Sequence, residues 1–456
     1  MSDISQQSEF TAQVIVVGAG LAGLSCAFEL AEKGIAVTVL EAAPHVGGRT
    51  ANWNEDGMAV ESGFHKFIGY YVALPELLER AGIEVDKIVH WEKTAQICHP
   101  EAQGIFGLDP LKAPLKTIAG ALGNNHLLSP MDKASLIPFF TAGFKDYIAH
   151  PDKLDRIPIR DYAFEHGVTI DALERLIEPL SSGIFFLPVE QYSSYAFFGL
   201  FAPALPRPQL VRIGAFEGGM TDVMTAPLAR AIEQRGGQVL TNAPVEQLSV
   251  QDGRVNGVQL QDGTVLQAEH TIVAVDIGQA KRLVGQHFGE HEGLADLMKL
   301  ESMPYVTVQF EAEEKLAHAD HTLFGPGTQL GSFSEQSRTT FKRDSGRASL
   351  ILVNPDELID LPDEEVWKRA LTSLQQIGLS GANTMTNYRV IRKHNSFYRL
   401  SAGNEKHRPR QMTPIPGLLL AGDYTNQPLL ATMEGAVISG QRAARALLKA
   451  QQETVR

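Results

Sequence analysis

Cysteine is scarce in this chain of 456 residues, which contains only Cys26 and Cys98. Two cysteines without metal-ligand spacing exclude a disulfide framework and give no sequence motif for a metal site. Positively charged residues are outnumbered by negatively charged ones, and the net charge is −13. This balance argues against a nucleic-acid-binding protein. No apolar run reaches the roughly 18 to 20 residues that a membrane-spanning helix needs.

The first residues, 1–13, are polar and lack the basic and apolar regions of a secretory signal. We therefore expect a short disordered tail over residues 1–13 and a cytoplasmic protein, with peripheral contact at a membrane surface left open. A chain of 456 residues is too long for one ordinary core, so two or three domains are expected. The content of hydrophobic residues, 44%, is that of a globular protein.

A glycine-rich turn follows the strand-like run at residues 14–17 and reads Gly18-Ala19-Gly20-Leu21-Ala22-Gly23. Gly18 allows the tight turn out of the strand, Gly20 leaves room for a pyrophosphate, and Gly23 lets the next helix pack closely. The phosphates of a dinucleotide would rest on backbone N–H groups at the start of that helix. A second strand-like run at residues 37–40 ends at Glu41, which is placed to accept hydrogen bonds from ribose hydroxyls.

Two further segments extend this dinucleotide site toward a longer cofactor. Soon after Glu41 and Ala42 comes Gly47-Gly48-Arg49, a second glycine pair with an arginine that could bind phosphates or position a flavin ring. Near the other end, a buried strand-like run enters Gly422-Asp423, and a helix starts near Met433. Asp423 could bind ribityl hydroxyls, and the positive end of the helix would point at the flavin N1–C2 carbonyl region.

These segments resemble the superfamily of FAD-containing amine oxidases and carotenoid desaturases, and within it the plant- and cyanobacterial-type phytoene and zeta-carotene desaturases. The matching stretches are residues 14–50, 61–69 and 422–437. The resemblance implies an α/β fold in which a Rossmann-like FAD-binding domain of the glutathione reductase type is assembled from discontinuous segments. It also implies that the residue at Val245 contacts the adenine through its backbone. The predicted cofactor-binding residues are Gly18, Ala19, Gly20, Leu21, Ala22, Gly23, Glu41, Ala42, Gly47, Gly48, Arg49, Val245, Gly422, Asp423 and Met433.

We predict that the FAD-binding domain comprises residues 14–100, 207–300 and 405–456. Two Asp-Gly turns, at residues 252–253 and 262–263, predict a small β-meander within it. An α+β substrate-binding domain would be formed by the insertions at residues 101–206 and 301–404, the first mostly helical and the second rich in strand-like runs.

Two features of the sequence favour an apolar substrate. Amine oxidases of the superfamily typically carry an aromatic residue just before Met-Glu-Gly-Ala, whereas this chain has Thr432. A dense aromatic run either lines a hydrocarbon tunnel, dips into a membrane surface or forms ordinary core. It comprises Phe185, Phe186, Tyr192, Tyr195, Phe197, Phe198 and Phe201. His65 and Thr432 are the candidate catalytic residues; His65 could equally be structural, and no general base is assigned.

The resulting prediction is an FAD-dependent desaturase that removes hydrogens from an elongated apolar substrate, by resemblance a carotenoid precursor such as phytoene or zeta-carotene. A quinone or oxygen would reoxidise the flavin. The alternative is an FAD-dependent amine or imine oxidase that acts on a small nitrogen compound. A third hypothesis is a non-catalytic prenyl-lipid binding protein built on the same fold.

Overall fold

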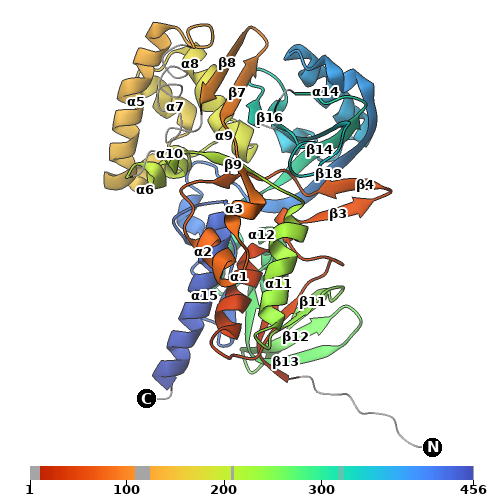
Figure 1. The fold of residues 1–456 in the computed structure, drawn as a ribbon. Helices are drawn as coiled ribbons and strands as arrows, with labels where there is room; N and C mark the ends of the chain where they lie inside the picture. The colour runs from red at the N-terminus through yellow and green to blue at the C-terminus, as the bar shows by residue number, and fades with distance from the viewer. Residues whose placement is uncertain (1–10, 108–123, 207–209, 318, 320–321, 455–456) are drawn as a thin grey trace, which may run out of the picture.

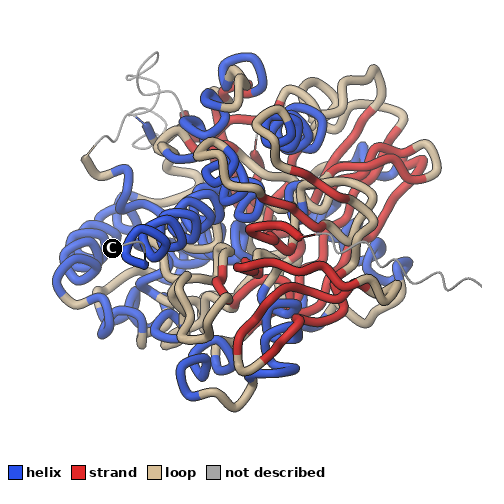
Figure 2. Tube along the Cα trace, turned by 90° about the horizontal axis from the view of Figure 1, so that it is seen from below, coloured by secondary structure: helices blue, strands red, loops and turns tan. Residues whose placement is uncertain are grey.

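The computed structural model describes residues 11–107, 124–206, 210–317, 319 and 322–454. Two seven-stranded sheets organise these residues, one in the lower half of the molecule in Figure 1 and one in the upper half. A group of helices lies beside the upper sheet. Figure 2, seen from below, shows helices gathered around the C-terminal end and strands on the opposite side.

The lower sheet has the strand order β10-β2-β1-β13-β12-β11, with β19 paired to β13. Neighbours from β10 to β13, and β13 with β19, are parallel, whereas β11, β12 and β13 form an antiparallel meander. The β1 side chains from residue 14 to 17 are all buried, as expected for a strand covered on both faces. The strands are β1 (Thr11–Val17), β2 (Val37–Leu40), β10 (Gln238–Leu240), β11 (Val245–Gln251), β12 (Arg254–Leu260), β13 (Val265–Val273) and β19 (Leu418–Leu420).

The predicted meander is confirmed by the pairing of β11, β12 and β13. Its first turn places Asp252 and Gly253 at positive φ, 51° and 74°, which is the backbone that a tight Asp-Gly hairpin requires.

Helices from both ends of the chain pack on this sheet and against each other. In α1 (Leu21–Ala31), almost every side chain is buried. It crosses α15 (Met433–Thr454), where a Cβ on Gly440 would lie 2.1 Å from the carbonyl oxygen of Ala22. A glycine is therefore required at this crossing. Ser25 of α1 donates a hydrogen bond to the carbonyl of Val437, 3.0 Å away.

The upper sheet has the order β18-β14-β17-β16-β15-β7-β8, and all its pairs are antiparallel except β15 with β7. Trp367 of helix α14 (Asp363–Gln376) packs on this sheet against Phe310 and Tyr388. The strands are β7 (Thr94–His99), β8 (Ala102–Gly107), β14 (Ser302–Ala312), β15 (Thr322–Phe324), β16 (Leu330–Glu335), β17 (Gly346–Leu352) and β18 (Met385–Tyr398).

The described part of the first insertion is mostly helical, as predicted, apart from strand β8 at its start, and its helices lie at the upper left of Figure 1. Its helices are α5 (Pro130–Ala149), α6 (Pro151–Asp155), α7 (Ile159–Glu165), α8 (Ile170–Ala172), α9 (Glu178–Phe185) and α10 (Ser194–Phe201). The other helices are α2 (Ala73–Arg80), α3 (Val85–Ile88), α11 (Ala226–Glu233), α12 (Ile277–Phe288), α13 (Ala295–Lys299) and α14 (Asp363–Gln376). Small ladders join β3 (Asn52–Glu55) to β4 (Met58–Glu61), and β9 (Ile213–Phe216) to β5 (Phe67–Ile68) and β6 (Val89–Trp91).

Two predicted boundaries need correction. Strand β1 begins at Thr11, so residues 11–13 belong to the sheet, because their backbone pairs with β13; residues 1–10 of the predicted tail lie outside the described residues. The hairpin β7–β8 pairs with β15 of the upper sheet, although β7 falls within the predicted cofactor segment 14–100. The remaining domain division stays a proposal, and residues 108–123 of the helical insertion lie outside the described part of the chain.

Candidate cofactor and active site

The first glycine turn has the geometry that its three glycines predict. Gly18 has φ +104°, and a Cβ there would lie 2.8 Å from the carbonyl oxygen of Ala274. A Cβ on Gly23 would lie 1.9 Å from the carbonyl oxygen of Gly18, so the helix approaches the strand too closely for any side chain. A Cβ on Gly20, in contrast, would meet no atom within 4 Å. The open side of the turn is therefore at Gly20.

The start of α1 is suited to hold an anion at this open side. Its N-cap residue, Gly20, provides no side-chain cap, and the first turn carries no acidic residue. Ala19, Leu21 and Ala22 have buried side chains, so these residues would contribute backbone only. Uncapped N–H groups and the positive end of the helix dipole together favour a phosphate group.

Glu41 lies directly after β2 and is held against the glycine turn. Its Oε2 accepts a hydrogen bond from Ala19 N–H at 2.8 Å, and its Oε1 accepts one from Ala43 N–H at 2.9 Å. Each oxygen retains a second lone pair for a ribose hydroxyl. Ala42 beside it is exposed. The backbone of Ala243 donates to the carbonyl of Glu41, which brings the start of β11 at Val245 close to this end of the site.

The second glycine pair lies against the first. Gly47 N–H donates to the carbonyl of Ala19 at 2.9 Å, and Gly47 forms an isolated bridge with Gly20. Gly48 has φ +57°, and a Cβ on it would lie 3.3 Å from Cα of Gly20. The two glycine segments thus form one continuous backbone cradle, consistent with the expectation that both approach the same cofactor.

Arg49 and Asp423 are brought together although 374 residues separate them in sequence. The Nη2 atom of Arg49 lies 2.5 Å from Oδ1 of Asp423, and the guanidinium carbon of Arg49 lies 4.5 Å from the ring centroid of Phe397. The sequence predicts phosphates or the flavin ring as the ligand of Arg49, and ribityl hydroxyls as the ligand of Asp423. In the structure, the two side chains form an ion pair, so they lie next to each other.

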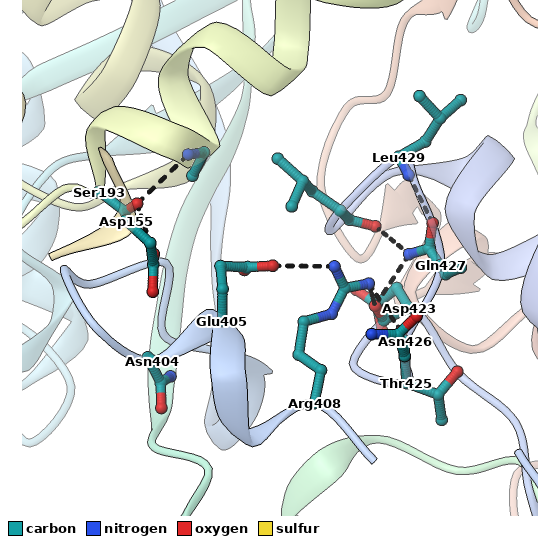
Figure 3. A network of polar contacts seen from close by, with 12 residues as sticks. Asp155, Ser193, Asn404, Glu405, Arg408, Asp423, Thr425, Asn426, Gln427 and Leu429 are labelled. Atoms are coloured by element: carbon teal, nitrogen blue, oxygen red, sulfur yellow. Dashed lines mark hydrogen bonds and ion pairs between the residues drawn. The ribbon is translucent and has the colours of Figure 1, made fainter. Parts of the chain in front are cut away.

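The loop that carries Asp423 is fixed from behind by Arg408, which the sequence analysis missed. Figure 3 shows the Arg408 guanidinium between Glu405 and this loop. Arg408 Nη2 donates to the carbonyl oxygens of Asp423 at 3.0 Å and Thr425 at 2.7 Å. Gly422 has φ +147°, and its N–H donates to Oγ of Ser439 on α15. No residue pattern marks Arg408, because its partners are mostly backbone carbonyls.

Helix α15 starts at Met433, as predicted, and Met433 is buried. Thr432, one of the two catalytic candidates, caps this helix: its Oγ1 accepts from Gly435 N–H at 3.0 Å and donates to the carbonyl of Leu429 at 2.7 Å. The threonine hydroxyl therefore caps the start of the helix. Glu434 is also structural, because its carboxylate accepts three backbone N–H groups from the start of α2.

His65, the other catalytic candidate, lies close enough to Arg49 for the positive charge of the guanidinium to act on the imidazole. The Nδ1 atom of His65 lies 2.8 Å from the carbonyl oxygen of Gly63, and this contact fixes the proton on Nδ1 and leaves a lone pair on Nε2. Burial lowers the pKa of His65 to about 4, and the positive charge of Arg49 acts in the same direction. The imidazole is therefore neutral at neutral pH.

An aromatic cluster adjoins Arg49. Phe186, Tyr305 and Phe397 have ring centroids 5.5 to 6.3 Å apart and come from the end of α9, from β14 and from β18. Of the predicted aromatic run, only Phe186 belongs to this cluster. Phe197 and Phe198 are fully buried and pack around Phe139 of α5, so they form ordinary core.

Tyr305 and Phe397 were missed by the sequence analysis, since they lie in separate strands of a sheet whose pairing the sequence does not reveal.

Within the described ranges, no group of His, Cys, Asp and Glu side chains could hold a metal ion. Cys26 and Cys98 are buried free thiols, and burial raises the pKa of both. No described helix is long and apolar enough to cross a membrane.

The glycine cradle, the uncapped helix and Glu41 at the end of β2 have the geometry that a dinucleotide site requires. The profile described as flavin containing amine oxidoreductase matches residues 21–448, and the chain belongs to this family. It is therefore an FAD-dependent oxidoreductase. The open space at Gly20 and the pair of positive-φ glycines beside it fit a pyrophosphate, so the cradle suits FAD.

Comparison with known proteins gives the same family and fold. The 15-cis-phytoene desaturase of Synechococcus elongatus is 26% identical over 97% of each chain, and that of Solanum lycopersicum is 28% identical over 96% of this chain and 78% of the relative. An oxidoreductase from Methanosarcina mazei and a putrescine oxidase with putrescine bound each superpose with a TM-score of 0.73. Both are 18% identical and cover 96% of this chain and 99% of their own. The predicted α/β fold with a Rossmann-like FAD-binding part and a substrate domain is confirmed.

Proposed function

We propose that the protein desaturates an elongated apolar substrate, of the class of carotenoid precursors such as phytoene or zeta-carotene. Bound FAD would supply the chemistry by accepting a hydride from a substrate carbon. The protein would supply orientation and an apolar, water-excluding wall. The observation that carries this proposal is the aromatic cluster of Phe186, Tyr305 and Phe397 beside Arg49 and Asp423.

The polar residues near this wall support the same reaction. His65 is neutral and presents a lone pair rather than a charge, so it can orient a substrate without attracting an anion. We propose that Arg49 and Asp423 hold the ribityl and ring end of FAD, and that Glu41 and the two glycine segments hold its adenosine diphosphate. Val245 would contact the adenine, and Met433 would direct the start of α15 at the flavin ring.

The competing proposal is an amine or imine oxidase, which would need a slot between two aromatic faces for the nitrogen. The aromatic pairs of the described residues support this less well. Tyr147 and Tyr195 stack directly on each other, with centroids 4.9 Å apart. The face of Phe397 is covered by the guanidinium of Arg49. The hypothesis of a non-catalytic prenyl-lipid binder loses its basis, because the chain is a member of a flavin oxidoreductase family.

An anaerobic reduction experiment tests the proposal. Flavin-loaded protein is mixed with liposomes that carry phytoene or zeta-carotene and, separately, with a panel of primary and secondary amines. We expect bleaching of the oxidised flavin band and a product with one more carbon–carbon double bond and a longer conjugated system from the carotenoid liposomes only. Carotenoid-free liposomes and flavin-stripped protein are the controls. Bleaching by an amine alone would establish the competing activity.

We also propose that the electron acceptor is a quinone or oxygen and that the protein contacts a membrane surface peripherally. Support for the contact comes from α5, on which Met131, Ile137 and Ile148 are 72%, 67% and 76% exposed. Apolar side chains so exposed on one helix are typical of a surface that is covered in use.

A further inference from the structure

A buried network of charged side chains lies behind the loop that carries Asp423 (Figure 3). Glu405 Oε2 lies 2.9 Å from Nη1 of Arg408, and Arg408 holds the loop of Asp423. Asp423 in turn pairs with Arg49. On the far side, Oδ1 of Asp155 accepts a hydrogen bond from Ser193 Oγ at 2.7 Å. The carboxyl of Asp155 faces the backbone of Glu405, whose charge acts on it.

The charges in this network do not balance. Asp155, Glu405 and Asp423 are three carboxylates, whereas Arg49 and Arg408 are two guanidiniums. The side chains of Glu405, Arg408 and Asp423 are each at most 10% exposed. Oε1 of Glu405 is buried, and the neutral phenol of Tyr398 is the hydrogen-bonding side chain beside Glu405. An uncompensated buried charge is costly, and the usual remedy in proteins is to bind a proton.

The groups that face this carboxyl pair from neighbouring elements do not supply the missing positive charge. Tyr398 comes from β18, Tyr192 and Tyr195 from the start of α10, and Tyr147 from α5, and the charge of Glu405 acts on all four. Burial raises the pKa of each of these phenols, so they stay neutral. Arg408 is the cation that the network itself provides.

We propose that Asp155, with the buried charge of Glu405 beside it, acts as a proton store for the redox cycle. This inference rests on the proposed function. In the substrate, one C–H bond would break with loss of a hydride. The C–H bond on the adjacent carbon would break with loss of a proton, and the electrons of that bond form the new double bond. The hydride would go to the cofactor and the proton to Asp155. A quinone that then takes two electrons also takes two protons, one with the hydride and one from the store, so the cycle closes.

Two pKa directions support this assignment. Burial, with the charge of Glu405 added, raises the pKa of Asp155 to about 6, so its carboxyl can gain and lose a proton near neutral pH. His65 is the titratable base nearer to Arg49, but its lowered pKa prevents it from holding a proton there. Asp155 holds the proton in this scheme without touching the reacting atoms, and Glu405 acts only through its charge on Asp155.

The midpoint potential of bound FAD, measured by spectroelectrochemistry from about pH 5.5 to about pH 8, reports on the store without any substrate. Each extra proton taken up with two electrons steepens the slope by about 30 mV per pH unit. We expect the wild-type slope above about pH 6 to exceed that of Asp155→Asn by up to this amount. The Glu405→Gln substitution should also reduce the slope, because it removes the negative charge that helps to raise the pKa of Asp155. Asp152→Asn, an exposed change on the same helix, is the matched control.

Equal slopes in the wild type and in a flavin-loaded Asp155→Asn or Glu405→Gln variant would overturn the proton store and leave the proposed function standing. A wild-type protein that holds FAD but oxidises amines only would overturn the proposed substrate class, while the slopes still test the store. Asn and Gln keep the hydrogen bonds to Ser193 and Arg408, so at least one variant is expected to fold, and thermal unfolding checks this directly.

Discussion

Replacing Gly20 by alanine separates cofactor binding from protein stability. Gly20 has φ −75° and ψ 176°, which alanine adopts without strain, and its Cβ would meet no protein atom within 4 Å. The apoprotein should therefore be as stable as the wild type, or more stable by about 0.4–1 kcal/mol, because alanine restricts the unfolded chain. The methyl group would, however, occupy the space assigned to the pyrophosphate. Loss of one N–H bond to a charged phosphate costs about 1.5–3 kcal/mol, or roughly 10- to 150-fold in FAD affinity.

Gly23→Ala should behave in the opposite way. Its Cβ would lie 1.9 Å from the carbonyl of Gly18, so α1 must move away from β1, and overpacking of this kind costs about 1–3 kcal/mol in the apoprotein. The assay is thermal unfolding of both apoproteins, followed by FAD titration with quenching of flavin fluorescence. A Gly20→Ala protein that binds FAD as tightly as the wild type would refute the placement of the pyrophosphate at Gly20.

Three other substitutions test the site and its surroundings. Asp423→Asn should weaken FAD retention at least about tenfold, because it removes the charged partner of Arg49 and the proposed ribityl ligand. Wild-type flavin content of this variant after gel filtration would refute the assignment of Asp423 to the ribityl chain. His65 has a folded-state pKa below its unfolded value, so its contribution to stability is present above about pH 6.5 and is lost, by up to about 3 kcal/mol, as the pH falls toward 4. His65→Gln should flatten this part of the curve of unfolding free energy against pH, and an unchanged curve would contradict the buried neutral imidazole. Ile137→Glu on α5 should reduce co-sedimentation with phosphatidylcholine vesicles about tenfold or more, whereas Val265→Glu, an exposed site on β13, should not; equal loss in both variants would exclude α5 as the contact surface.

The parts of the site that the sequence predicts best are those in which neighbouring residues make the geometry. The turn from Gly18 to Gly23 and the carboxylate at Glu41 follow from local backbone requirements. The structure has a positive φ at Gly18, open space at Gly20 and close packing of the helix at Gly23. The pairing of Arg49 with Asp423 depends on which strands meet, and sequence spacing carries no information about it.

The same reason explains the residues that were missed or misassigned. Arg408 contacts backbone carbonyls, and Tyr305 and Phe397 meet only because β14 pairs with β18. Thr432 looked catalytic because of its place before Met433, yet a threonine at the start of a helix commonly caps it, and it does so here. The predicted segment boundary at residue 100 needs correction because β7, which comes before it, pairs with β15, a strand much later in the chain.

The position of β19 has a consequence for how the protein is made. Strand β13 lies between β1, near the start of the chain, and β19, near its end. The ribosome therefore finishes the glycine cradle long before Asp423 and α15 leave the exit tunnel. Until then Arg49 lacks its partner Asp423, and β13 lacks its neighbour β19. A chain that is cut short before Asp423 therefore has only one half of this ion pair.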